Sequence, residues 1–244
     1  MLAYRIIARL DIKGPNLIKG LQFEGLRVLG NPAEFAKKYA DDGADELIYI
    51  DTVASLYGRN NLEEIVDRTA QAVFIPLTVG GGIKSEVDAK RLFDSGADKI
   101  AINTEAIRSP DTIDKLSARY GRQAVSVSVD AKRVNGGWEA YTSNGRCKSE
   151  RDAVAWIHEA VRRGAGEILL TSIDMDGTRR GADIELLKAV KVEVPVIYSG
   201  GIRLDDVLEV SRYCDGLAIG ASLHYGNCTI QQVKDVLRPH REIR

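Results

Sequence analysis

Two aspartates in matching contexts are the first candidates for chemistry. Asp11 lies in RLDIKG and Asp130 in SVDAKR, 119 residues apart in a chain of 244 residues. Each ends an apolar, β-branched run, which places it at the carboxyl end of a predicted strand. Two carboxylates in a partly enclosed site can divide proton donation and acceptance if their surroundings separate their pKa values. The alternative is structural, with each aspartate capping a loop or pairing with Lys13 or Lys132.

Two glycine-rich segments, VGGGI and YSGGI, repeat at the same offset of 119 residues. Glycines such as Gly82 and Gly201 let backbone N–H groups approach an oxyanion, and a helix is expected just beyond each segment. Asn103, Thr104 and Ser222 follow neighbouring strands and add hydrogen-bond donors. The pattern predicts two phosphate sites on opposite sides of one mouth, and hence an elongated ligand with a phosphate at each end. Alternatively, the glycines only permit tight turns.

Eight short apolar runs that alternate with helical segments must position these residues. The expected strands cover residues 4–11, 45–51, 74–80, 98–103, 124–130, 167–172, 194–199 and 215–220. GADEL and GAGEI also repeat, so we predict two duplicated (β/α)4 halves that close into one α/β domain, a (β/α)8 TIM barrel over residues 1–244. An open doubly wound sheet is the alternative. Two Asn-Gly pairs predict a small hairpin insertion near residues 132–147.

Charged residues stand at or near the starts of several predicted strands. They are Arg5, Glu46, Lys99 and Glu167. Alternation along the first strand puts Arg5 on the same inward face as Asp11. We therefore expect a ring of salt bridges across the barrel floor, which either stabilises the fold or forms a gate.

Composition narrows the classes of partner. The chain has 34 basic and 35 acidic residues, so no overall field attracts nucleic acid or anionic lipid. It contains no apolar run of bilayer length and no secretory signal pattern, and its three dispersed cysteines fit a reducing cytoplasm. His158, His224 and His240 are scattered, and no nucleotide motif is present in the sequence. We therefore expect no metal and no cofactor.

Several segments together resemble one enzyme family. LDIK, IPLTVGGGI, GADKIAIN, VDAKR, GAGEILLTSIDMDGT and SGGI are similar to the cyclase subunits of imidazole glycerol phosphate synthase, from Met1 nearly to the C-terminus. The resemblance implies a duplicated barrel and a lyase of histidine biosynthesis. Such an enzyme uses ammonia from a partner glutaminase to convert a bis-phosphorylated aminoimidazole carboxamide ribonucleotide into imidazole glycerol phosphate and aminoimidazole carboxamide ribotide. It also implies a cytoplasmic heterodimer in which the glutaminase docks on the barrel floor near Asp98.

The same resemblance implies roles for individual residues. Asp11 is expected to be the general acid and Asp130 the general base. The residues at substrate- and phosphate-binding positions are Lys19, Gly82, Asn103, Thr104, Asp176, Gly177, Gly201 and Ser222. The ammonia gate is implied to consist of Arg5, Glu46, Lys99 and Glu167. Lys19 is expected in a flexible first loop that folds over the ligand.

Arg9 is the main departure from the family pattern, which usually has a small or neutral residue there. It precedes Asp11 by two residues, so it lies about 6–7 Å below it on the same strand face. A cation at that distance lowers the pKa of the carboxyl, which opposes a general-acid role, and it also fills the lumen through which ammonia would pass.

Arg9 and the altered first loop, GPN at 14–16, leave other functions open. One is a paralogue that delivers ammonia for amidination of a surface sugar. Another is a non-catalytic scaffold that activates a glutaminase. A sugar-phosphate isomerase of the neighbouring histidine step shares the duplicated barrel and the paired aspartates, but these segments match it less well.

Overall fold

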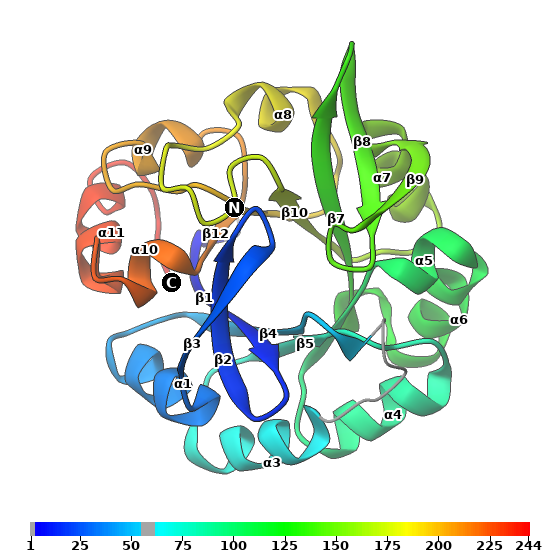
Figure 1. Cartoon of the computed structure of the whole chain (residues 1–244), viewed down its shortest axis with the longest axis horizontal. Helices are drawn as coiled ribbons and strands as arrows, with labels where there is room; N and C mark the ends of the chain where they lie inside the picture. The colour runs from blue at the N-terminus through cyan, green and yellow to red at the C-terminus, as the bar shows by residue number, and fades with distance from the viewer. Residues whose placement is uncertain (1–2, 55–61) are drawn as a thin grey trace.

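A closed parallel barrel forms the centre of the computed structural model, which describes residues 3–54 and 62–244 (Figure 1). Its eight strands in these ranges are β1 (Arg5–Lys13), β4 (Glu46–Asp51), β5 (Leu77–Gly80), β6 (Lys99–Ile102), β7 (Val125–Val134), β10 (Glu167–Ser172), β11 (Val196–Ser199) and β12 (Gly216–Ile219). Parallel pairing of β12 with β1 and of β7 with β10 completes the ring. The predicted (β/α)8 barrel is confirmed, and the strand ends differ from the predicted ones by a few residues. The predicted domain, 1–244, includes residues 1–2 and 55–61, which lie outside the described ranges.

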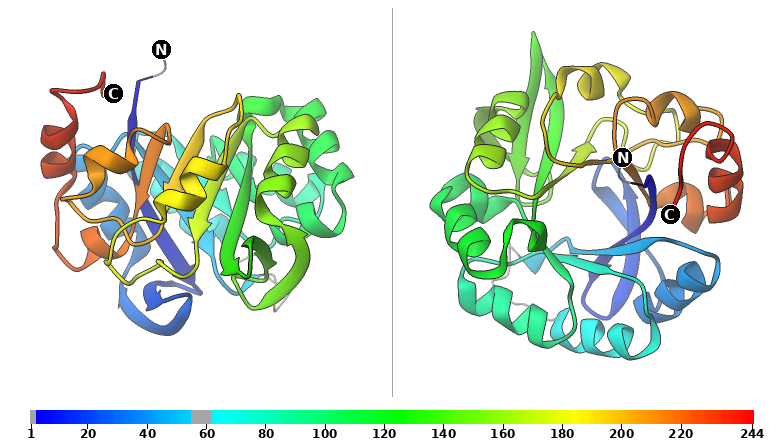
Figure 2. Two further views of the ribbon diagram at one scale, coloured as in Figure 1. Left: turned by 90° about the horizontal axis from the view of Figure 1, so that it is seen from above. Right: turned by 180° about the vertical axis from the view of Figure 1, so that it is seen from behind.

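Helices surround the barrel on its outside (Figures 1 and 2). They are α1 (Pro32–Asp41), α3 (Leu62–Ala72), α4 (Glu86–Asp94), α5 (Thr104–Arg108), α6 (Asp111–Tyr120), η1 (Arg122–Ala124), α7 (Ala153–Arg162), α8 (Ile184–Ala189), α9 (Val207–Val210), α10 (Ala221–His224) and α11 (Ile230–Leu237). Local sequence sets their starts. The Asn31 side chain caps α1, in which Pro32 is the first residue, and Thr229 and Gln232 form a capping box at α11.

Alternation along β1 separates two apolar cores. Ile6, Ala8 and Leu10 face the helices and belong to the large core between barrel and helices. Ile7 instead faces the lumen, where a small apolar layer contains Ile7, Ile48, Leu169, Ile197 and Ala218. Because side chains alternate along a strand, residues 5, 9 and 11 share the inward face with Ile7. The lumen therefore has a charged floor, an apolar layer and a polar mouth.

Two antiparallel hairpins extend the first strand of each half. β2 (Asn16–Leu21) pairs with β1 and with β3 (Glu24–Gly30), whereas β8 (Gly137–Thr142) pairs with β7 and with β9 (Cys147–Asp152). In the side view of Figure 2, the β2–β3 hairpin lies at the opposite end of the barrel from the chain termini. The second hairpin occupies the region of the predicted insertion, 132–147, but its pairing continues to Asp152.

The first hairpin places Lys19 on strand β2, where the sequence led us to expect a loop. Gln22 and Phe23 form its two-residue turn with φ angles of 51° and 65°. Such primed turns normally carry glycine or asparagine, so the sequence lacked the usual hairpin signal. No helix in the described part of the chain is long and apolar enough to cross a membrane.

Candidate active site

The two matching aspartates lie at equivalent places in the barrel mouth. Asp11 is near the end of β1, and Asp130 is on β7 where the barrel strand passes into the hairpin extension. Their exposed fractions are 4% and 6%, so both carboxyl groups are buried. The structure therefore brings the pair into one enclosed region, but it surrounds the two carboxyls differently.

Asp11 is held between two cations. Arg9 Nε lies 3.0 Å from Asp11 Oδ1, and Lys19 Nζ lies 2.7 Å from Asp11 Oδ2. Burial opposes ionisation, but the charges of Arg9 and Lys19 outweigh it and hold the pKa of Asp11 well below its usual range. Arg9 therefore acts on Asp11 in the direction expected from the sequence.

Lys19 connects Asp11 to the other side of the mouth. Its Nζ donates to Asp176 Oδ1 at 2.9 Å and to Asp176 Oδ2 at 3.1 Å. Burial would lower the pKa of Lys19, but Asp11 and Asp176 raise it above its ordinary value. Lys19 is 2% exposed and lies on β2, so it is part of the enclosed site.

Asp130 has a quite different environment. Its Oδ2 accepts a hydrogen bond from Asn103 Nδ2 at 2.9 Å. Burial raises the pKa of Asp130 to about 6, and the nearby charges of Asp176 and Asp11 add to the rise while Arg9 opposes it. A carboxyl with that pKa can both accept and release a proton near neutral pH.

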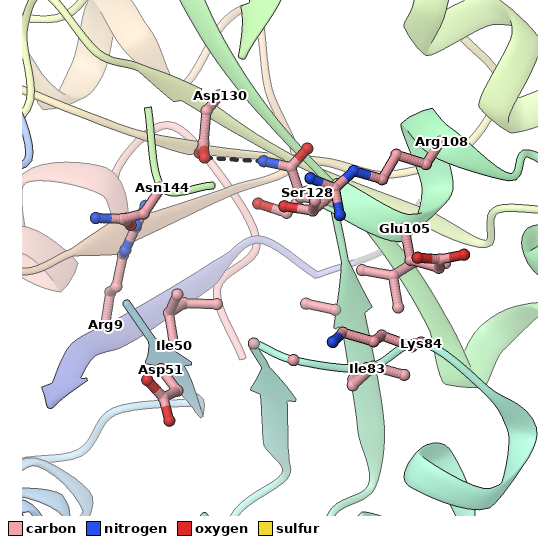
Figure 3. Close-up of a pocket in the computed structure, with 16 residues that line it drawn as sticks. Arg9, Ile50, Asp51, Ile83, Lys84, Glu105, Arg108, Ser128, Asp130 and Asn144 are labelled. Atoms are coloured by element: carbon pink, nitrogen blue, oxygen red, sulfur yellow. Dashed lines mark hydrogen bonds between the residues drawn. The ribbon is translucent and has the colours of Figure 1, made fainter. Parts of the chain in front are cut away.

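A first cavity extends from Asp130 towards the loops after β5 and β6. Figure 3 shows Arg9, Asp130, Lys84 and Arg108 around it. The predicted residues Gly82, Asn103 and Thr104 also line it. Asn103 Oδ1 and Asn144 Nδ2 are buried without a hydrogen-bond partner, so both could bind a ligand placed here. The Thr104 hydroxyl accepts from the Ser143 backbone N–H at 3.0 Å.

A second cavity occupies the corresponding place in the other half of the barrel. The predicted residues Lys19, Asp176, Gly177, Gly201 and Ser222 line it. Its glycines repeat the conformation of the first cavity, since Gly200 and Gly201 have φ angles of 118° and 72°, and Gly81 and Gly82 have 110° and 72°. Left-handed glycine turns of this kind leave backbone N–H groups open to an anion.

The four charges predicted for the barrel floor do form a ring of ion pairs. Arg5 lies 3.0 Å from Glu46 and 2.7 Å from Glu167, and Lys99 lies 3.0 Å from Glu46 and 3.3 Å from Glu167. Asp98 is exposed next to this ring, and its carboxylate accepts from the Leu77 backbone N–H at 2.8 Å. The structure thus gives Asp98 a strand-capping contact beside the floor.

Sequence reasoning missed several residues of the mouth. Arg108 lies on α5, and Asn144 lies in the β8–β9 turn with a φ of 56°. Thr171 accepts a 2.8 Å hydrogen bond from Arg9 Nη1 across the lumen. The Asn144-Gly145 pair was a turn signal, but nothing in the sequence indicated that its amide would enter the cavity.

The scattered histidines do not gather at the mouth. Among them His224 is partly buried, and its Nδ1 lies 2.7 Å from the Tyr39 hydroxyl. Burial lowers the pKa of His224 to about 4, so the ring is neutral near pH 7. Within residues 3–54 and 62–244, no group of three or more His, Cys, Asp or Glu side chains is arranged to hold a metal ion. Two buried carboxyls with oppositely shifted pKa values, next to left-handed glycine turns, favour acid–base chemistry on an anionic ligand.

Comparisons with known proteins agree with this architecture. Residues 5–229 match the family described as "Histidine biosynthesis protein". The chain is similar to "Imidazole glycerol phosphate synthase subunit HisF" of Legionella pneumophila, with 61% identity over 201 residues that cover 81% of this chain and 95% of the relative. The protein of the same name from Myxococcus xanthus is 45% identical over 243 residues, covering 98% and 96%. That of Trichormus variabilis is 43% identical over 248 residues, also covering 98% and 96%.

Proposed function

The chain belongs to the histidine biosynthesis protein family, and on that premise we propose that it is the cyclase subunit of an imidazole glycerol phosphate synthase. It is then a lyase that joins ammonia to a bis-phosphorylated aminoimidazole carboxamide ribonucleotide. The products are imidazole glycerol phosphate, aminoimidazole carboxamide ribotide and one molecule of water. We place this activity in the cytoplasm.

One observation carries the proposal. Two cavities with the same glycine backbone conformation flank two buried carboxyls, Asp11 and Asp130, at one end of the barrel. Each glycine turn offers N–H groups to a phosphate, so a ligand with a phosphate at each end spans the mouth and presents its middle to the carboxyls.

Individual residues follow from this binding mode. At the first phosphate we place Gly82, Asn103 and Thr104, because they line the cavity next to Asp130. The residues at the second phosphate are Asp176, Gly177, Gly201 and Ser222. Lys19 connects the second cavity to Asp11.

The floor ring is the proposed point of entry for ammonia. Arg5, Glu46, Lys99 and Glu167 close the end of the barrel opposite the mouth, so ammonia from a glutaminase docked near Asp98 must pass between them. The relatives are themselves named as subunits, which supports a partner. Above the ring, the apolar layer around Ile7 favours neutral ammonia over the ammonium ion, because a buried unpaired charge is costly.

A substrate-loss assay tests this function. Purified protein receives the ribulosyl form of the bis-phosphorylated substrate with excess ammonium salt at alkaline pH, which bypasses the glutaminase. Consumption above background is expected, and D130N should lose at least about 100-fold because general acid–base catalysis contributes about 10²–10⁴. Absence of consumption by correctly folded protein would contradict the proposal.

Growth of a cyclase-deficient strain without histidine separates this role from amidination of a surface sugar. Rescue by the chain is expected if histidine synthesis is its function. Failure to rescue, together with ammonia-dependent modification of a sugar, would favour the paralogue role. Glutaminase stimulation by D11N/D130N protein that binds no phosphate ligand would favour the scaffold role.

A further inference from the structure

Arg9 occupies a special place between the two cavities. Among the described residues, it alone lines both of them. Its Nε is 3.0 Å from Asp11 Oδ1, and its Nη1 reaches across the lumen to Thr171 on β10. Thr171 is the strand neighbour of Asp130 in the pairing of β10 with β7. The guanidinium therefore lies beside both carboxyls but forms its ion pair with Asp11.

The two carboxyls differ in how many of their oxygens are occupied. Both oxygens of Asp11 accept from buried cations, Oδ1 from Arg9 and Oδ2 from Lys19. A proton can be placed on Asp11 only if one of these ion pairs is broken. Protonation would leave Arg9 buried without its ion-pair partner and Lys19 with Asp176 alone, and uncompensated burial of a charge typically costs several kcal/mol.

Asp130 keeps one oxygen available. Its Oδ2 accepts from Asn103, and no donor from the described ranges meets its Oδ1. Asp130 also lines the first cavity, where a ligand would lie (Figure 3). A proton can therefore move between this carboxyl and a ligand without disrupting an ion pair.

On the basis of these contacts, and of the proposed function, we infer that Arg9 removes Asp11 from proton transfer and that Asp130 alone carries the proton. Asp130 takes a proton from the ammonia-derived nitrogen as this nitrogen forms the C–N bond that closes the imidazole ring. It returns that proton to the departing nitrogen of the ribotide as the old C–N bond breaks, so this exchange needs no second acid. Asp11 stays ionised and fixes Lys19 and Arg9 in the mouth. Arg9 is thus a positioning residue, and it makes the two equivalent aspartates chemically unequal.

The charged groups with the largest influence on the pair are consistent with this assignment. Arg9 and Lys19 face Asp11 from β1 and β2, and the neutral His224 lies nearby on α10. Asp176 and the ionised Asp11 face Asp130, and they and burial favour its protonated form against the opposing charge of Arg9. Removal of the Arg9 charge should therefore raise the pKa of both carboxyls.

Carboxyl ¹³C NMR titration of the whole chain tests the inference without relying on turnover. The signals of Asp11 and Asp130 are assigned from their absence in D11N and D130N. In the wild-type protein, Asp130 should titrate near pH 6 and Asp11 should stay ionised between pH 4.5 and 8. In R9Q, the pKa of Asp11 should rise by about 1–3 pH units, the usual effect of losing an adjacent cation.

Matched variants make the result specific. R9K keeps a cation and should retain the ionised Asp11, whereas R119Q removes an exposed arginine that pairs with Glu86 and should leave both titrations unchanged. If R9Q does not fold, the titration of wild-type Asp11 and Asp130 still tests the inference. Titration of Asp11 between pH 4.5 and 8 in the wild type, or an Asp130 that does not titrate there, would overturn the inference. Lack of substrate consumption would instead refute the proposed function and leave these titrations valid.

Discussion

Lys19→Met should destabilise the protein, because it removes the buried ion pairs that Lys19 forms in the barrel mouth. The Lys19 ammonium is 2% exposed and lies 2.7 Å from Asp11 and 2.9 Å from Asp176. Met has a similar length but no charge, so both carboxylates lose a buried counter-charge. Breaking a buried ion pair by removing one partner costs about 3–5 kcal/mol of unfolding free energy. Because Asp11 keeps Arg9, most of that loss is expected to come from Asp176.

Urea denaturation of wild type and K19M at several pH values measures this loss. The variant should be about 3–5 kcal/mol less stable at pH 7. The difference should shrink at lower pH, because Lys19 lowers the pKa of Asp11, and the stability that this gives the wild-type fold is lost as pH falls through that lowered pKa. K37M is the matched control, since Lys37 forms an exposed ion pair with Asp41 and should change stability by less than about 0.5 kcal/mol. A loss of unfolding free energy below about 1 kcal/mol in K19M, or a loss that does not depend on pH, would refute the claim that Lys19 forms buried ion pairs with Asp11 and Asp176.

Three further predictions concern the carboxyls and the cavities. D130N should be more stable than wild type by about 2–3 kcal/mol at pH 8, because a raised pKa means that the ionised carboxylate destabilises the wild-type fold. This gain should vanish as pH falls below about 4. Urea titrations that show D130N to be less stable than wild type at pH 8 would contradict the prediction. G201A should raise KM for the bis-phosphate at least about tenfold. The added Cβ would lie 2.1 Å from the Gly181 carbonyl oxygen, so the glycine turn at the second cavity would have to shift. That shift weakens a charge-assisted hydrogen bond to phosphate, which is typically worth about 1.5–3 kcal/mol. G226A is the control, because Gly226 has nearly the same φ, 69°, but open space around it, so KM should stay unchanged. Equal changes of KM in G201A and G226A would argue against the second phosphate site. R108Q should raise KM by about 10- to 100-fold with little change in kcat, because it removes a charged hydrogen-bond donor at the first cavity; an unchanged KM would exclude this contact.

The sequence alone was sufficient to predict the barrel fold and many of the residues that line its mouth. Strand runs with regular spacing, and the 119-residue offset shared by Asp11 and Asp130, predicted both the closed fold and the equivalent positions of the two carboxyls. Alternation from Asp11 also predicted the inward direction of Arg5 and Arg9. These features depend on local periodicity and on an internal repeat, and a single sequence displays both directly.

The remaining features depend on contacts between distant segments. The β2–β3 hairpin was missed because Gln22 and Phe23 adopt positive φ angles without glycine, so Lys19 was expected in a mobile loop. Asn144 enters the first cavity only because the β8–β9 turn folds back over the barrel. Neither contact leaves a periodic signal in the sequence.

The unequal environments of the two aspartates were only partly predictable. The spacing of Arg9 and Asp11 predicted a lowered pKa for Asp11. The sequence did not show that Lys19 would occupy the second oxygen, or that burial would raise the pKa of Asp130 to about 6. Two aspartates at equivalent positions in the repeat therefore have different chemical environments.

Incorporation of nitrogen from ¹⁵N-labelled ammonium chloride tests the proposed activity most directly. The protein is incubated with the bis-phosphorylated ribulosyl substrate, and the imidazole glycerol phosphate formed is analysed by mass spectrometry. We predict a product one mass unit heavier than that made with unlabelled ammonium, and at least about 100-fold less of it with D130N. Recovery of intact substrate without labelled imidazole product, from folded wild-type protein, would contradict the proposed cyclase function.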